Sequence, residues 1–386
     1  MKIVEIQRFP IRMTPVKTGY RAEDELSRIA RVETVIVRVV TDSSVVGYGE
    51  AGSIAAYLNQ TMGGLLDWLQ AYADALVGAD ALNLNEINRR LDKVSGEFPP
   101  GCQPARAAID MAMYDIVGKA REVPVHAVLG GAYRTELELL TNLYEETPEE
   151  KAAAARRFVE QGFSGLKVKI GDSIILDGRT SDNLEHEKQK LLAVLRTVGP
   201  QTYIDADANQ SWANAGQVRG IFASILDEEF YGNLSLEQPL HHLNLKGHAE
   251  LRETLPIPII LDESVVSPEA MMQIATTGAA DRIVLKISRV GGLQKALQIV
   301  DICETAAIGV SIDTMPFTKL GDAAHCHLAA TIRDHYPIDA EGHLWFEKTP
   351  FAGGFNIANG RVTLSDEPGL GVELDEGILA ELSIDP

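Results

Sequence analysis

Apolar and polar residues alternate along the first fifty positions, as they do in β-strands with one buried face. Such segments run over residues 2–11, 33–41 and 45–50, and residues 42–44, Asp-Ser-Ser, supply a turn between the last two. Short strands joined in this way predict an antiparallel meander.

The apolar spacing becomes helical between residues 65 and 120. Ala105, Ile109, Met113 and Ile116 recur at helical spacing with charged residues between them, which predicts a helix with one buried face. Residues 1–125 are therefore expected to form an α+β unit.

Strand-like and helix-like segments then alternate. The predicted strands cover residues 137–144, 165–170, 202–208, 234–238, 258–262, 282–287, 309–313 and 342–346. Predicted helices follow the first two at 149–161 and 183–198. Eight strands at this spacing favour parallel βαβ units closed into a (β/α)₈ barrel. We place this barrel at 126–352 and expect residues 353–386 to return to the first unit.

Two lysines mark the second predicted barrel strand. Lys167 and Lys169 are two residues apart, so their ammonium groups leave the same face of the strand. Their repulsion, on the order of 4 kcal/mol at ~4 Å and an effective dielectric of ~20, is expected to lower one pKa by about three units. The lysine with the lowered pKa would be a base at neutral pH.

Charged residues end the next strands as well. Asp207, Glu237 and Asp262 end strands three to five, and Lys286 ends strand six. Each shares its strand face with residues expected to point into the barrel. A single such residue is usually a helix cap or a member of an ion pair, but five at consecutive strand ends favour a common site.

Converging carboxylates require a counterion. Ligation by oxygen alone selects Mg²⁺, with Mn²⁺ as the alternative, whereas zinc prefers His and Cys. Such an ion can hold a substrate carboxylate and neutralise the charge that develops when the neighbouring α-proton leaves. Asp205 faces the same way as Asp207 and competes with it, and the Asp207-x-Asn209 pattern favours Asp207.

The motifs together resemble the enolase superfamily, in its mandelate racemase and muconate lactonizing enzyme family, and more closely the muconate lactonizing subgroup. The matching pieces are Lys167-Val-Lys169, Asp207-Ala-Asn209, Leu236-Glu-Gln-Pro239, Leu261-Asp-Glu-Ser264 and Leu285-Lys-Ile-Ser-Arg-Val-Gly-Gly292. The resemblance implies an α/β fold, a (β/α)₇β modified TIM barrel with an N-terminal α+β capping domain that the C-terminal segment completes.

The resemblance also implies roles for individual residues. Asp207, Glu237 and Asp262 would hold Mg²⁺. Lys169 and Lys286 would be the acid/base groups on opposite faces of the substrate carbon, and Lys167 would stabilise the enolate beside the substrate carboxylate.

Substrate selection in this family is attributed to two capping-domain loops and to the ends of strands seven and eight. Tyr20 and Tyr57 are candidates to stack on a ring or an ammonium group. Asn209, Asp313 and Lys319 are the other substrate-binding candidates, and Asp322 and Trp345 are candidates to line the far side with Lys319. Asp313 stands where mandelate racemase and similar sugar-acid dehydratases have a histidine base, which disfavours a sugar-acid substrate.

The spacing between strands two and three is long. Residues 171–186 therefore form an insertion, which either covers the site or contacts a neighbouring subunit.

The first functional hypothesis is a racemase or epimerase of an amino-acid derivative, because two bases permit inversion. The alternatives are a dehydratase of a hydroxyproline-like or other hydroxy acid and a muconate-type cycloisomerase. A catalytically dead barrel is the non-enzyme alternative, and the presence of all five charged residues argues against it. A metal-dependent aldolase or phosphate-binding barrel is a further alternative. The absence of a glycine-rich loop at residues 314–319 argues against a phosphate-binding barrel.

The composition of the chain limits the kinds of molecule that it is expected to bind and the compartment in which it is expected to be found. The chain has 386 residues, 45% of them hydrophobic, and a net charge of −20, which disfavours nucleic acid and anionic membranes. Its 3 cysteines lack C-x-x-C spacing, so we expect a reducing, cytoplasmic location. We expect neither export nor membrane insertion, a small-molecule carboxylate as substrate, and a homo-oligomer.

Overall fold

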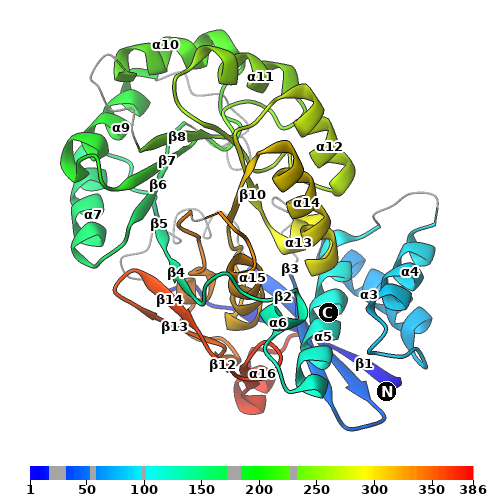
Figure 1. Ribbon diagram of the computed structural model, residues 1–386. Helices are drawn as coiled ribbons and strands as arrows, with labels where there is room; N and C mark the ends of the chain where they lie inside the picture. The colour runs from blue at the N-terminus through cyan, green and yellow to red at the C-terminus, as the bar shows by residue number, and fades with distance from the viewer. Residues whose placement is uncertain are drawn as a thin grey trace.

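The computed structural model divides into a curled parallel sheet surrounded by helices and a smaller unit below it (Figure 1). The structure describes residues 1–16, 32–52, 58–96, 101–171, 184–226, 233–334 and 336–385.

The smaller unit begins with a three-stranded antiparallel sheet in the order β1-β2-β3, as predicted. The strands are β1 (Ile3–Met13), β2 (Val32–Thr41) and β3 (Val46–Gly52). The helices that follow are α3 (Met62–Leu76), α4 (Leu84–Ser95) and α5 (Gln103–Arg121). This arrangement confirms the meander and the presence of the helix. The prediction that α5 has a single buried face is wrong, since residues 104–118 are all buried. The helix packs against β3 and α3 and also against α13 (Ile287–Val290) of the barrel.

Helix α5 packs directly on strand β3, and two glycines allow it. A Cβ atom at Gly49 would lie 1.9 Å from the carbonyl oxygen of Ala108, and one at Gly47 would lie 2.2 Å from that of Ala112. No side chain fits at these distances, so the helix and the strand approach each other through bare backbone.

The barrel contains seven hydrogen-bonded parallel strands in the order β11-β10-β9-β8-β7-β6-β5. They are β5 (Leu140–Leu143), β6 (Gly165–Lys169), β7 (Tyr203–Asp207), β8 (Leu234–Glu237), β9 (Ile259–Leu261), β10 (Arg282–Leu285) and β11 (Gly309–Ile312). The helices are α6 (Val125–Val128), α7 (Pro148–Glu160), α9 (Leu184–Val198), α10 (Ala215–Leu226), α11 (Leu245–Thr254), α12 (Pro268–Thr277), α13 (Ile287–Val290), α14 (Leu293–Ala306) and α15 (Lys319–Ala330). Helices α7 and α9 to α12 line the outside of the curled sheet (Figure 1).

The predicted eighth strand at residues 342–346 is wrong. Gly342–Trp345 is a 3₁₀ helix, η1, and a Cβ at Gly342 would lie 2.2 Å from the carbonyl oxygen of Met315, so this glycine permits a tight approach to the preceding loop. The gap between β11 and β5 is bridged instead by two residues: Asp339 donates its N–H to Ile312 at 3.1 Å, and Ile338 accepts from Leu140 at 3.0 Å.

The predicted first barrel strand divides in two. Strand β4 (Glu136–Glu138) leaves the barrel and pairs with β14, and only β5 joins the parallel sheet. The C-terminal elements are β12 (Phe351–Gly353), β13 (Phe355–Ala358), β14 (Arg361–Leu364), β15 (Val372–Leu374) and α16 (Glu376–Leu382).

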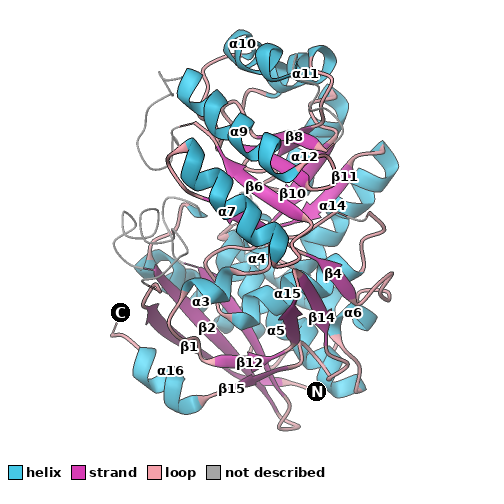
Figure 2. Cartoon of the chain, turned by 90° about the vertical axis from the view of Figure 1, so that its left-hand side faces the viewer, coloured by secondary structure: helices cyan, strands magenta, loops and turns pink. Residues whose placement is uncertain are grey.

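The end of the chain lies against its beginning. Helix α16 packs on β1 (Figure 2), and Ser383 just after it forms a β-bridge with Ile11. Both the barrel and the smaller unit have buried apolar cores. None of the helices in the described ranges combines the length and the apolar character needed to span a bilayer.

Candidate active site

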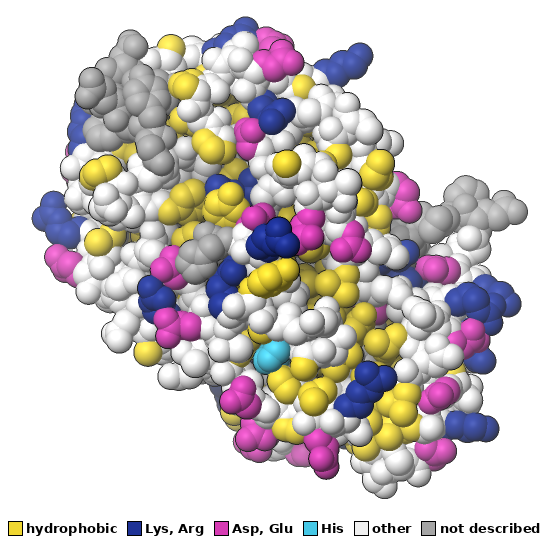
Figure 3. All heavy atoms as spheres, in the orientation of Figure 1, with side chains coloured by type: hydrophobic (Ala, Val, Ile, Leu, Met, Phe, Trp, Pro, Cys, Tyr) yellow, Lys and Arg dark blue, Asp and Glu magenta, His cyan; other side chains and the backbone are white. Residues whose placement is uncertain are grey.

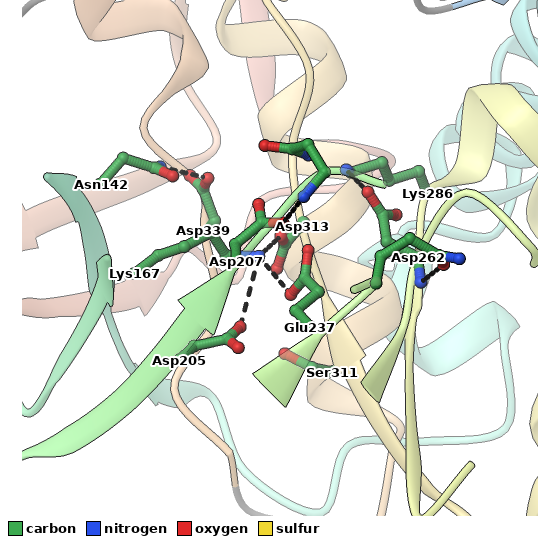
Figure 4. A network of polar contacts seen from close by, with 12 residues as sticks. Asn142, Lys167, Asp205, Asp207, Glu237, Asp262, Lys286, Ser311, Asp313 and Asp339 are labelled. Atoms are coloured by element: carbon green, nitrogen blue, oxygen red, sulfur yellow. Dashed lines mark hydrogen bonds and ion pairs between the residues drawn. The ribbon is translucent and has the colours of Figure 1, made fainter. Parts of the chain in front are cut away.

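The charged residues predicted to converge lie at the carboxyl ends of adjacent strands. In the parallel register, Lys169 on β6 is opposite Asp207 on β7, and Asp207 is opposite Glu237 on β8. Asp262 and Lys286 directly follow β9 and β10. The side chains of Asp207, Glu237, Asp262 and Lys286 gather in one polar network (Figure 4), and Lys169 lines the same cavity as Lys286.

Lys167 is buried among carboxylates. Its Nζ lies 2.6 Å from Glu237 Oε2, 2.6 Å from Asp313 Oδ2 and 3.4 Å from Asp205 Oδ2 (Figure 4). The side chain is 2% exposed. A buried charge is tolerated when it is paired in this way.

The predicted fall in a lysine pKa through repulsion is wrong for Lys167. Burial lowers its pKa, but Asp313, Glu237, Asp205 and Asp207 together outweigh this and hold the pKa well above its usual value. The repulsion argument considered the two lysines alone, whereas the folded barrel surrounds one of them with acids. Lys167 is therefore a fixed positive charge.

The other two lysines pair with the other two predicted metal ligands. Lys169 donates to Asp207 and, at 3.2 Å, to Asn209 Oδ1. Lys286 donates to Asp262 Oδ2 at 2.6 Å, and Arg289 donates to the other oxygen of Asp262. Each predicted base thus contacts a predicted metal ligand.

Asn209 supports this arrangement through three contacts. Its backbone N–H donates to Asp207 Oδ1 at 2.9 Å, and its side-chain amide donates to Glu263 at 3.2 Å. Together with the bond from Lys169, these contacts orient the end of β7.

The three predicted metal ligands differ in the direction of their pKa shifts. Burial alone would raise the pKa of Asp262, but Arg289 and Lys286 lower it below its ordinary value. Asp207 behaves similarly beside Lys169 and Lys167. The pKa of Glu237 is raised well above its ordinary value by burial and by the neighbouring Asp205 and Asp207.

A cavity of about 660 Å³, including the part open to solvent, lies over these strand ends. Its lining residues are Asn142, Tyr144, Lys167, Lys169, Asn209, Asp262, Glu263, Lys286, Arg289, Asp313, Thr314, Met315, Pro316, Asp339 and Trp345. Asp207 and Glu237 are buried beneath it. Basic and acidic side chains gather near the centre of this face of the molecule (Figure 3).

One substrate-binding candidate, Lys319, lies outside the cavity lining. Its ammonium group lies 4.8 Å from the centre of the Phe355 ring. Tyr20 and Tyr57 lie outside the described residues, as do residues 172–183 of the predicted insertion.

The cavity also contains residues that the sequence analysis missed. Asn142 and Tyr144 come from the end of β5, and the Asn142 amide donates to Asp339 Oδ2 at 2.9 Å. Asp339 follows the bridging residue Ile338, where no strand is predicted. The alternation of residues 140–144 was a signal for Asn142 and Tyr144, but none marked Asp339.

The residues that could hold a metal fit a hard cation by their chemistry. Three carboxylates come from adjacent strands. Four buried carboxylate oxygens in and beneath the cavity have no hydrogen-bond partner among the described residues: Asp205 Oδ1, Glu237 Oε1, Glu263 Oε2 and Asp313 Oδ1. Within those same residues, no three His, Cys, Asp or Glu side chains lie close enough to share an ion, because the acids turn toward lysines. The donor set is that of Mg²⁺ or Mn²⁺.

Comparison with known proteins gives two family matches. Residues 10–130 match the N-terminal domain of mandelate racemase and muconate lactonizing enzyme, and residues 150–378 match the enolase C-terminal domain-like family. Members of this family generally use Mg²⁺ and act on small carboxylates.

Individual relatives cover nearly the whole chain. A hydrophobic dipeptide epimerase of Enterococcus faecalis is 29% identical over 96% of this chain and 99% of its own. A cis-3-hydroxy-L-proline dehydratase of Roseibium aggregatum is 29% identical over 99% of this chain and 98% of its own. The crystal structure of muconate lactonizing enzyme from Pseudomonas putida superimposes with a TM-score of 0.87 and 27% identity, covering 100% of both chains.

By their names these relatives are isomerases and a lyase. The structural match to muconate lactonizing enzyme extends over the whole chain and so includes both the curled parallel sheet and the separate N-terminal unit. The protein is an enzyme of the mandelate racemase/muconate lactonizing enzyme family of the enolase superfamily.

Proposed function

We propose that this enzyme abstracts the proton α to a carboxylate and inverts that carbon, as a racemase or epimerase of an amino-acid derivative. One observation carries the proposal: Lys169 and Lys286 line the same cavity from β6 and from the end of β10, with β7, β8 and β9 between them. Two potential bases on separated strands permit proton removal on one face of a substrate and return on the other.

The three intervening strands supply the predicted metal ligands, Asp207, Glu237 and Asp262. When bound there, Mg²⁺ would neutralise the negative charge that develops on the substrate carboxylate. Lys167 adds a buried positive charge beside Glu237 and Asp313. A fixed cation oriented in advance stabilises an enolate without reorganisation during the reaction.

The lysines are engaged in ion pairs in the resting arrangement. Before either amine can take a proton from the substrate carbon, its contact with the carboxylate must open: that of Lys169 with Asp207, or that of Lys286 with Asp262. In a turnover, the neutral lysine takes the α-proton and the protonated lysine on the other side donates one.

An amino-acid derivative suits the remaining wall of the cavity. Asp313 and Asp339 line it together with the ring of Trp345. Carboxylates and an aromatic face attract an ammonium group and repel a second substrate carboxylate. The names of the epimerase and dehydratase relatives, which specify a dipeptide and a hydroxyproline, are consistent with such a substrate.

A dehydratase of a hydroxyproline-like acid is the second candidate, because a relative with that name matches as well as the epimerase does. There one lysine would take the α-proton and a β-hydroxyl group would leave. A muconate-type cycloisomerase is the third, on the strength of the structural similarity.

Proton exchange in D₂O tests the proposal. The enzyme with Mg²⁺ is incubated with proline derivatives, N-acyl amino acids, dipeptides and hydroxy acids, and the α-proton signal is followed by NMR. Exchange with inversion supports the epimerase, and loss of water supports the dehydratase.

Substitution of each lysine tests whether both act as bases. Lys169→Ala and Lys286→Ala should each abolish inversion, whereas Lys348→Ala, which removes a surface ion pair with Glu381, is the matched control. Full inversion in either of the first two variants would refute the two-base proposal.

A further inference from the structure

Helix α15 starts directly behind the cavity and contacts both parts of the molecule. It follows β11 and packs against β3, β11 and η1. Its first turn carries Asp322, a carboxylate that is fully buried and not among the cavity-lining residues.

Both oxygens of Asp322 hold segments that form the cavity wall. Oδ1 accepts the hydroxyl of Thr314, which lines the cavity. Oδ2 accepts the backbone N–H of His343 at 2.8 Å and its ring Nδ1 at 2.6 Å. His343 lies in η1, two residues before the cavity-lining Trp345.

The two held segments also touch each other. The missing side chain of Gly342 leaves room for the carbonyl oxygen of Met315, 2.2 Å from where a Cβ would be. The loop 314–316 and the turn 342–345 therefore form one wall, and Asp322 is joined to both of its halves.

The start of α15 is itself anchored to the N-terminal unit. Glu50 of β3 is completely buried and accepts the N–H of Thr318 at 2.9 Å, its hydroxyl at 2.6 Å and the N–H of Gly321 at 3.2 Å. These are the free donors at the start of the helix, which a carboxylate satisfies well. Asp322 is thus held at a fixed place beneath the wall.

We propose that Asp322 is a positioning residue that sets substrate selectivity, by fixing the Thr314 loop and the Trp345 turn, which line the same cavity as Lys169 and Lys286. The inference rests on the proposed function for its substrate-dependent part. A buried carboxylate that accepts three bonds from two loops restricts their positions, and displacement of a substrate-contacting wall by ~1 Å can cost on the order of 100-fold in rate.

The test begins with Asp322→Asn, whose amide cannot accept from Thr314 and from both donors of His343 at once. Trp345 is made the single tryptophan by Trp68→Phe and Trp212→Phe, and its quenching by acrylamide is measured without substrate. We expect severalfold stronger quenching, since the wall is released. With a substrate from the exchange panel, KM should rise more than kcat falls, with kcat/KM reduced by roughly ten- to a hundredfold.

His343→Phe provides an independent variant, because it removes the ring donor and keeps the aromatic contact with Phe355. His343→Phe removes one of the three bonds that Asp322 accepts, so Asp322→Asn should have a smaller effect in the double variant than it has in the wild type. Cys326→Ala on the same helix, a buried residue without a role in the wall, is the control and should leave Trp345 quenching and KM unchanged.

Unchanged Trp345 quenching in folded Asp322→Asn, or full additivity with His343→Phe, overturns the proposal. If Asp322→Asn does not fold, His343→Phe decides by the same quenching measurement. Because this measurement needs no substrate, absence of α-proton exchange in the wild-type enzyme would count against the proposed function and leave the positioning role to be judged by fluorescence.

Discussion

The buried Glu50 provides a prediction that needs no substrate. Burial raises its pKa from 4.5 to about 7, and the bonds from Thr318 and Gly321 offset only part of that rise. A carboxyl whose pKa is higher in the folded protein stabilises the fold below its unfolded pKa and loses that contribution as pH rises through the folded value.

The size of the effect follows from the two pKa values. Taking 4.5 for the unfolded chain and about 7 for the folded one, the contribution of Glu50 falls by roughly 2–3 kcal/mol between about pH 5 and pH 8. Glu50→Gln resembles the protonated acid and does not titrate. The stability of the wild type relative to this variant should therefore fall by that amount over the same interval.

Urea denaturation of both proteins at the two pH values measures the difference, since all other titrating groups cancel. Glu373→Gln, at an exposed position of β15, controls for the loss of one negative charge and should follow the wild type to within ~0.5 kcal/mol. A wild-type minus Glu50→Gln difference that is the same at both pH values would show that the reasoning about this carboxyl is wrong.

Two further substitutions probe the site and the packing. Lys167→Met leaves Glu237 and Asp313 buried without their shared cation, so the unfolding free energy at pH 7 should fall by roughly 3–5 kcal/mol. Part of this loss should be recovered at pH 5, because Glu237, whose pKa is already raised, takes up a proton. An equal loss at both pH values in denaturant titrations would contradict this. Gly49→Ala places a Cβ 1.9 Å from the Ala108 carbonyl oxygen and should cost about 1–3 kcal/mol in thermal melts. Gly63→Ala, where a Cβ meets nothing within 4 Å, is its matched control, and equal melting temperatures for the two would exclude the proposed clash.

The sequence predicted the strand ends well because the two-residue period of a strand is a local property. Lys167 and Lys169 had to share a face wherever that strand lay, and parallel pairing then brought Asp207 and Glu237 beside them. Most strands and helices lie within a few residues of their predicted bounds, since alternation and helical spacing report local burial.

The closing segment of the barrel was missed for the opposite reason. Residues 342–346 are apolar enough for a strand, but Gly342 turns tightly against the Met315 backbone, and Ile338 and Asp339 bridge the gap. That choice depends on contacts between segments more than twenty residues apart. Local pattern carries no information about them.

The chain itself therefore determined which residue types stand at the strand ends and on which face. The tertiary structure decided what surrounds them. Lys167 is enclosed by acids, which keep its pKa high, and Lys319 contacts the Phe355 ring. Asp322 accepts hydrogen bonds from both the Thr314 loop and the His343 turn. Side-chain direction along a strand repeats with the backbone, whereas charge environment and burial depend on distances that only the folded chain sets.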